Sequence, residues 1–95
     1  MKFEWDINKA SANLKKHKVD FSEAIEALKD EFGLDDFDRS HSDVKEYRYT
    51  RIGLSRKDIL FVIYVMRSEN DVYRIISARK AAKSEEELYW EARYE

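Results

Sequence analysis

The residues whose types and spacing best suit chemistry lie in the last quarter of the chain. Arg79 is followed after six residues by Glu85 and after ten residues by Tyr89. If a helix begins at Ser84, Glu85 and Tyr89 lie one turn apart on the same helical face. A guanidinium, a carboxylate and a phenol would then meet at one spot, where they can bind a phosphate group and move protons. The same spacing also allows a purely structural ion pair at a strand end.

Other classes of site find little support in the sequence. The two histidines, His17 and His41, have no helix-spaced histidine or cysteine partner, and the aspartates at 35–38 lack the spacing and glycine of a calcium loop. With two glycines and no cysteine, the chain cannot build a glycine-rich phosphate loop, a nucleophile elbow, a dinucleotide fingerprint, a disulfide or a cysteine nucleophile. We therefore expect neither a bound metal ion nor a cofactor.

Charge is unevenly distributed along the chain. Residues 20–46 contain ten acidic and three basic residues, whereas residues 47–83 contain three acidic and nine basic residues. This asymmetry suggests a surface that faces a polyanion and an acidic surface elsewhere, although charge runs are more often solvated faces. The sequence shows neither a membrane-spanning run nor a signal peptide, and we expect a cytoplasmic protein without membrane contact.

A predicted β-hairpin has to position the arginines. Residues 59–66 are apolar at every position, as in a central strand, and residues 72–81 alternate and are rich in β-branched residues. The polar tetrapeptide at 68–71 predicts the turn between them. Alternation from Val44 to Gly53 predicts a preceding strand, which completes a three-stranded antiparallel meander. Arg67 and Arg79 end two antiparallel strands of this hairpin, so they need not be adjacent.

A short strand and three helices are expected around the meander. Residues 3–5 alternate like a strand, and Asp6 and Asp20 are the predicted N-caps of two helices. In the first helix the apolar residues Ile7, Ala10 and Leu14 recur at helical spacing. The other side is more polar and carries Lys9, Asn13, Lys16 and His17. Residues 29–43 predict a loop, and Ser84 is the predicted N-cap of a last helix. The length and the order of elements predict a single α+β domain over residues 1–95.

Several of these stretches, in this order, resemble the BrnT toxins of BrnT/BrnA toxin-antitoxin modules. The resemblance rests on F-E-W-D at 3–6, F-S-E-A at 21–24, I-G-L-S at 52–55 and R-I-I-S-A-R-K-A at 74–81, with Lys9, Asn13, Lys16, His17, His41, Glu46, Arg48, Glu85 and Tyr89. It extends from Phe3 to about Tyr89. Lys18 and Asp20 depart from the glycine and the serine that are usual in the family, and the loop before Asp43 is unusually acidic.

This resemblance implies a RelE-like fold and a ribonuclease that stops translation. It also implies neutralisation by a BrnA-like antitoxin with a ribbon-helix-helix domain, through which the complex contacts operator DNA. The implied assembly is a heterotetramer with two copies of each protein. Carried over position by position, the active-site candidates are Arg67, Arg79, Glu85 and Tyr89.

Cleavage of RNA without a metal ion needs a base for the 2′-hydroxyl proton, positive charge at the phosphorane oxygens and an acid for the leaving 5′-oxygen. We assign Glu85 as the base, and Arg79 and Arg67 as phosphate ligands. Tyr89 would orient the substrate or donate the proton. The secondary RNA-binding candidates are Lys9, His17, Arg74 and Lys80. Two alternatives stay open on the sequence: a module of this fold that binds RNA without cleaving it, and a protein-interaction domain.

Overall fold

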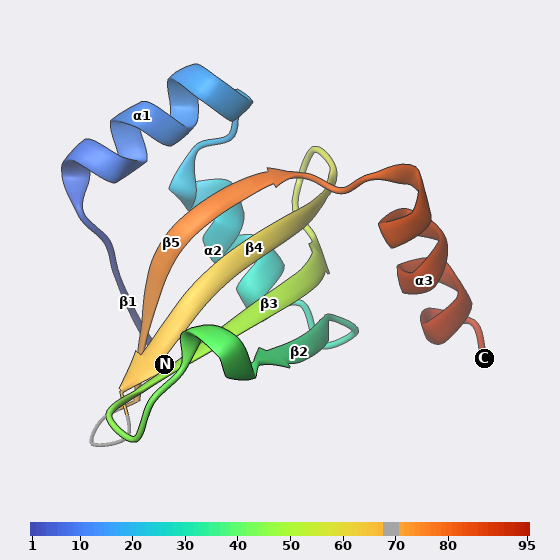
Figure 1. The fold of residues 1–95 in the computed structure, drawn as a ribbon. Coiled ribbons are helices and arrows are strands. Elements are labelled where there is room, and N and C mark those ends of the chain that lie inside the picture. Colours follow the sequence, from blue (N-terminus) through green and yellow to red (C-terminus); the bar gives the residue numbers. More distant parts are fainter. Residues whose placement is uncertain (68–70) are drawn as a thin grey trace.

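A five-stranded mixed sheet forms the centre of the molecule (Figure 1). The computed structural model describes residues 1–67 and 71–95, so the predicted turn residues 68–70 lie outside the described part. The elements in chain order are β1 (Lys2–Glu4), α1 (Ile7–His17), α2 (Phe21–Lys29), β2 (Leu34–Asp38), the 3₁₀ turn η1 (Arg39–His41), β3 (Glu46–Leu54), β4 (Ile59–Arg67), β5 (Val72–Lys80) and α3 (Lys83–Arg93). The strand order is β1-β5-β4-β3-β2, with β1 parallel to β5 and the other neighbours antiparallel. The predicted α+β class and the meander are confirmed.

Strand β2 corrects the loop predicted at residues 29–43. Asp35 and Asp38 lie opposite Arg51 and Arg48 of β3, and the Asp35 carboxylate forms an ion pair with Arg51 at 2.6 Å. Aspartate disfavours strands when considered alone, but opposite charges on neighbouring strands stabilise the pairing. The acidic stretch therefore becomes an edge strand because the next strand is basic.

Aspartates begin the first two helices, as predicted. The Asp6 carboxylate accepts hydrogen bonds from the N–H groups of Asn8 and Lys9, and the Asp20 carboxylate accepts one from Ser22. Helix α1 is followed by Lys18, which has a φ of 60° in the left-handed region that favours glycine. Lys18, where the resemblance leads us to expect a glycine, thus lies at a position where a side chain is strained.

Helix α1 turns its polar side toward the sheet. Ile7 and Leu14 are 78% and 46% exposed, whereas Asn13 is buried. The Asn13 side chain donates to the carbonyl oxygens of Val19 and Ala78, and it accepts a hydrogen bond from the Ala78 N–H group. Because β1 pairs with only the first three residues of β5, the rest of that strand would otherwise be an unpaired edge. The need for a polar partner there explains why Ile7 and Leu14 face solvent, whereas Ala10 of the same predicted stripe packs against the main core.

Helix α2 covers one face of the sheet and forms the main core with it. The buried side chains of this core include Phe21, Ala24, Ala27, Leu28, Leu60, Val62, Tyr64, Ile75 and Ala78. Gly53 permits the close approach, because a Cβ atom there would lie 2.4 Å from the Ala27 carbonyl oxygen. The Arg51 guanidinium then donates to the carbonyl oxygens of Ala27, Leu28 and Asp30 at the end of α2.

Helix α3 packs over one end of the opposite face. Tyr89 is fully buried in a second, smaller core with Ile52 and Ile59. The N-cap of α3 is Ala82 rather than the predicted Ser84, because the Glu85 carboxylate accepts a hydrogen bond from the Ala82 N–H group at 2.7 Å. Within residues 1–67 and 71–95, no helix has the length and apolar character needed to span a membrane.

Candidate functional site

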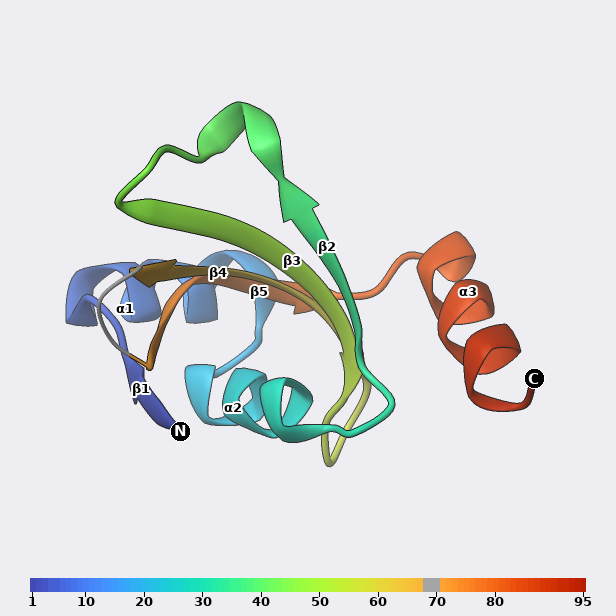
Figure 2. The same cartoon turned by 90° about the horizontal axis from the view of Figure 1, so that it is seen from below.

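One face of the sheet carries a patterned set of cationic side chains. Figure 2 shows α2 against the other face, α3 at one end of the sheet and the turn η1 on the side away from α2. Residues directly opposite one another on neighbouring strands share a face. Three such rows cross β3, β4 and β5: Arg48, Val65 and Arg74; Thr50, Ile63 and Ser77; and Ile52, Phe61 and Arg79. We call this surface the open face. It presents three guanidinium groups and two hydroxyl groups over apolar side chains.

An ion pair marks the α3 end of the open face. Arg79 Nη1 and Nη2 donate to the two carboxylate oxygens of Glu85 at 2.8 and 2.9 Å, and the guanidinium lies 4.2 Å from the centre of the Phe61 ring. Hydrogen bonding to Glu85 raises the pKa of Arg79, and hydrogen bonding from Arg79 lowers the pKa of Glu85. Both groups are therefore charged at neutral pH. The Arg79 side chain remains 39% exposed, so it is accessible to an anionic ligand.

Tyr89 belongs to a different set of contacts. Its hydroxyl donates to an Asp30 carboxylate oxygen at 2.5 Å and accepts from Arg93 Nη1 at 3.0 Å. The expected meeting of Tyr89 with Arg79 and Glu85 is therefore not what the structure shows. Burial and the hydrogen bond to Asp30 raise the pKa of Tyr89. This contact ties α3 to the end of α2.

The same contacts explain the state of the Asp30 carboxylate. Burial alone would raise its pKa, but hydrogen bonds from the Tyr89 hydroxyl and from the N–H groups of Leu54 and Phe32 hold the pKa below its usual value.

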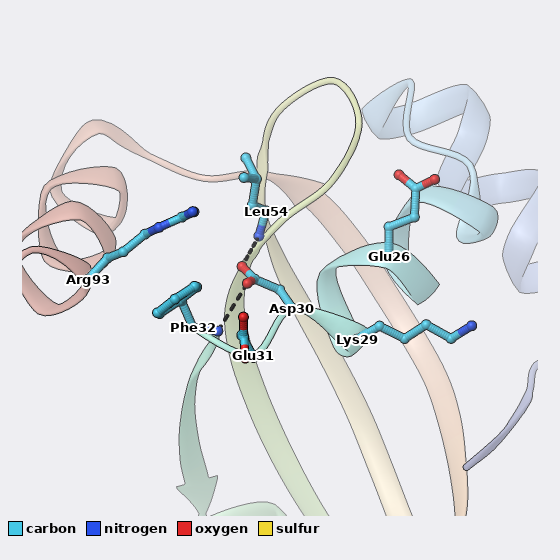
Figure 3. Close-up of a pocket in the computed structure, with 7 residues that line it drawn as sticks. All are labelled: Glu26, Lys29, Asp30, Glu31, Phe32, Leu54 and Arg93. Atoms are coloured by element: carbon cyan, nitrogen blue, oxygen red, sulfur yellow. Dashed lines mark hydrogen bonds between the residues drawn. The ribbon is translucent and has the colours of Figure 1, made fainter.

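Asp30 lines a cavity of about 580 Å³ between α2, β3 and α3 (Figure 3). The cavity is lined by three acidic residues and two basic residues, so its charge does not favour a polyanion.

A second cavity, of about 230 Å³, lies between α1 and β5. Its lining residues are Lys9, Ala12, Asn13, Lys16 and His17 of α1, with Ile76 and Ser77 of β5. Two of the predicted secondary RNA-binding residues, Lys9 and His17, are thus brought together. Ser77 also belongs to the open face, so the cavity adjoins that surface.

Of the remaining predicted site residues, Arg67 and Arg74 lie apart from the ion pair at α3, whereas the Lys80 carbonyl oxygen accepts a hydrogen bond from Arg79 Nη1 at 3.1 Å. Arg67 is at the far end of β4, where its Nε atom is 3.6 Å from a Glu46 carboxylate oxygen. Arg74 is on the open face, 3.7 Å from Glu4. Lys80 is 68% exposed at the end of β5. Arg74 therefore lies on the open face, whereas Arg67 and Lys80 lie at strand ends.

Sequence reasoning did not select Arg48 as a site residue. Arg48 lies opposite Val65 on the open face, and in the described part of the chain its buried Nε atom has no hydrogen-bond partner. The alternation of Tyr47, Arg48 and Tyr49 is the sequence signal that could have identified it, because it places the arginine on the face opposite to the tyrosines.

His41 also has a partner that its loop position did not predict: its Nδ1 atom is 2.8 Å from Asp38 Oδ2.

The chemistry available on the open face is that of guanidinium groups. Arginine binds phosphate through directed, paired hydrogen bonds. Among the described residues, no group of three or more histidine, aspartate or glutamate side chains is arranged to hold a metal ion. The open face is therefore suited to binding a phosphate-bearing chain.

Comparison with known proteins gives a family for the chain. The model of the family described as "Ribonuclease toxin, BrnT, of type II toxin-antitoxin system" matches residues 5–85. No curated protein matches the chain. The matched range contains every residue of the open face and ends at Glu85.

Proposed function

The chain belongs to the BrnT family of ribonuclease toxins of type II toxin-antitoxin systems, and from this premise we propose that it cleaves RNA bound along the open face. One observation carries the proposal. Arg48 comes from β3, and Arg74 and Arg79 come from β5 on the other side of β4. All three lie on the sheet face opposite to α2, with α3 over one end of that face. Such a surface provides the phosphate contacts that dominate affinity for nucleic acids.

The length of the open face suits a single-stranded segment. Arg74 and Arg79 are five positions apart on β5, which corresponds to about 16 Å at about 3.3 Å per residue. The hydroxyl groups of Thr50 and Ser77 lie between them and can bond to sugar or phosphate oxygens. A backbone of a few nucleotides therefore fits between the two arginines.

We propose that the reaction proceeds without a metal ion and that Arg79 supplies the positive charge at the phosphorane oxygens. A preorganised contact of this kind contributes about 10²–10³-fold to a rate. Glu85 holds the guanidinium in place and is the nearest carboxylate to it, so we assign it as the base; its lowered pKa keeps it in the ionised form that accepts a proton. Arg67 would bind a phosphate further along the RNA, and Tyr89 would support α3.

The proposed cellular effect is inhibition of translation in the cytoplasm, relieved by an antitoxin of the BrnA type. The family description, a ribonuclease toxin of a type II toxin-antitoxin system, supports a toxic ribonuclease and a partner antitoxin. We propose that the antitoxin has a ribbon-helix-helix domain that binds operator DNA, and that two copies of each protein assemble. A fold related to that of the RelE toxins is part of the same proposal.

Incubation of the purified protein with RNA, in chelator and in magnesium buffer, tests the proposed activity. We expect equal cleavage in both buffers. The products should carry 2′,3′-cyclic phosphate ends, because the 2′-hydroxyl is the attacking group. An RNA of the same sequence with 2′-O-methyl groups, which lacks this nucleophile, should not be cleaved. Cleavage that requires magnesium would contradict the metal-independent mechanism. Binding that weakens with salt but yields no products would favour the RNA-binding module that does not cleave.

A further inference from the structure

The cavity between α1 and β5 is lined by basic side chains that have no role in the proposed reaction. Of its seven lining residues, Lys9, Lys16 and His17 are basic, and no carboxylate lines it in the described part of the chain. The larger cavity beside α3 has three acidic residues among its seven. Of these two hollows, the one beside β5 therefore suits an anion.

The cationic side chains of this cavity occupy one side of α1. Lys9, Lys16 and His17 share that side with Asn13, whereas Lys15, which is adjacent in sequence to Lys16, does not line the cavity. Asn13 is anchored to the backbone of Ala78 by two hydrogen bonds, so the distance between α1 and β5 is fixed. The three basic side chains are thus held beside the strand that carries Arg79.

The irregularity of β5 connects the cavity to the open face. The pairing of β4 with β5 shifts between Ile63 and Tyr64, which leaves Ile76 without a partner residue in β4. Bulges of this kind are over-represented next to active sites, where they redirect side chains. Ser77 follows the bulge and shares its face with Arg79, two positions further and about 7 Å away along the strand. A chain bound at Arg79 can therefore continue into the cavity.

We propose that this cavity is a second phosphate-binding subsite, in which Lys9, Lys16 and His17 bind the phosphodiester next to the one held by Arg79. The inference rests on the proposed function, because it takes RNA as the polyanion. Lysines bind phosphate as point charges, which suits a position where the backbone is held but not cleaved. The Ser77 hydroxyl provides a hydrogen bond between the two phosphate positions.

Salt-dependent binding of a 2′-O-methyl oligonucleotide, which cannot be cleaved through its 2′-hydroxyl, tests the subsite. For single strands each phosphate contact contributes about 0.7 to the slope of log affinity against log salt. We expect the double variant Lys9→Ala/Lys16→Ala to lower this slope by about 0.7, because the two lysines bind a single phosphodiester. The double variant Lys15→Ala/Lys57→Ala removes the same charge outside the cavity and should leave the slope unchanged. Equal slopes in the two double variants would overturn the subsite.

Inorganic phosphate separates this inference from the proposed function. We expect phosphate to shift the NMR signals of the His17 ring and the Ser77 amide in the unaltered protein, and not in Lys9→Ala/Lys16→Ala. If phosphate causes these shifts but the protein cleaves no RNA, the cavity is an anion site and the proposed function is overturned. Cleavage of RNA without these shifts, and with equal slopes, would overturn the subsite alone. The rest of each NMR spectrum reports whether the variant is folded.

Discussion

The side-chain amide of Asn13 hydrogen-bonds both backbone groups of Ala78. Its nitrogen donates to the Ala78 carbonyl oxygen at 2.8 Å, and its oxygen accepts from the Ala78 N–H group at 3.0 Å. The same nitrogen donates to the Val19 carbonyl oxygen at 3.0 Å. One side chain thus replaces the neighbouring strand that β5 lacks beyond β1, and it fixes α1 beside the residue that precedes Arg79.

Replacing Asn13 should destabilise the fold strongly. We expect Asn13→Ala to lower the free energy of unfolding by about 2–4 kcal/mol, because each buried backbone group left unpaired costs about 1–3 kcal/mol. Urea unfolding measures this change. Asn8→Ala, at an exposed position of the same helix, should stay within about 0.5 kcal/mol of the unaltered protein. Similar losses in the two variants would contradict the bridging role of Asn13.

The lysine at position 18 should make the folded protein less stable than a glycine at the same position would. Its φ of 60° is costly for a residue with a side chain and is accessible to glycine. We expect Lys18→Gly to raise the free energy of unfolding by about 1 kcal/mol, measured by thermal or urea unfolding. Lys15→Gly, inside α1, should lower it by about 1 kcal/mol instead. A destabilised Lys18→Gly protein would refute the assignment of strain at this helix end.

The hydroxyl of Tyr89 should contribute to stability through Asp30. Tyr89→Phe removes a hydrogen bond to an ionised, partly buried carboxylate, so we expect a loss of about 1.5–3 kcal/mol in the free energy of unfolding. Tyr94→Phe removes the hydroxyl of a tyrosine that is 77% exposed and should change it by less than about 0.5 kcal/mol. If unfolding of Tyr89→Phe matches that of the unaltered protein, Tyr89 does not anchor α3.

The ion pair of Glu85 should stabilise the fold in a pH-dependent way. Because the folded protein lowers the pKa of Glu85, the ionised carboxylate stabilises the fold above its unfolded pKa of about 4.3, and this contribution disappears as the pH falls through the folded pKa. Glu85→Gln can keep the contact with the Ala82 N–H group. We expect it to be less stable than the unaltered protein at pH 7, by roughly 1 kcal/mol, since Arg79 is partly exposed. Urea unfolding at pH 7 and pH 3 should show the difference shrinking in acid; a constant difference would contradict the ion-pair contribution.

The elements with strong local signals were predictable from the sequence. The aspartate caps at Asp6 and Asp20, the apolar strand β4 and the alternation of β3 all led to the observed elements. Strand β2 was not predictable in the same way, because its aspartates are stabilised by arginines of the next strand rather than by local preference. The side of α1 that faces the sheet could not be predicted for a similar reason, because the hydrogen-bond partner of Asn13 is 65 residues away in the sequence.

The candidate site was predictable only where its contacts are local. Arg79 and Glu85 are six residues apart across a strand end and a helix start, and the structure pairs them. Tyr89 followed from helical spacing, but its partner Asp30 comes from a distant helix end. The alignment of Arg48 with the arginines of β5 depends on the register of three strands, which no single stretch of sequence determines.

The most direct test of the account compares RNA cleavage, in chelator, by Arg79→Ala and by Arg56→Ala. Arg56 pairs with Glu26 on the α2 side at 2.7 Å, and its side chain is 49% exposed against 39% for Arg79, so the two variants lose comparable ion pairs. We predict that Arg79→Ala lowers the cleavage rate by about 10²–10³-fold while remaining folded, and that Arg56→Ala stays within a few-fold of the unaltered protein. A folded Arg79→Ala protein that cleaves RNA at the unaltered rate would contradict the central claim that the open face is the catalytic surface.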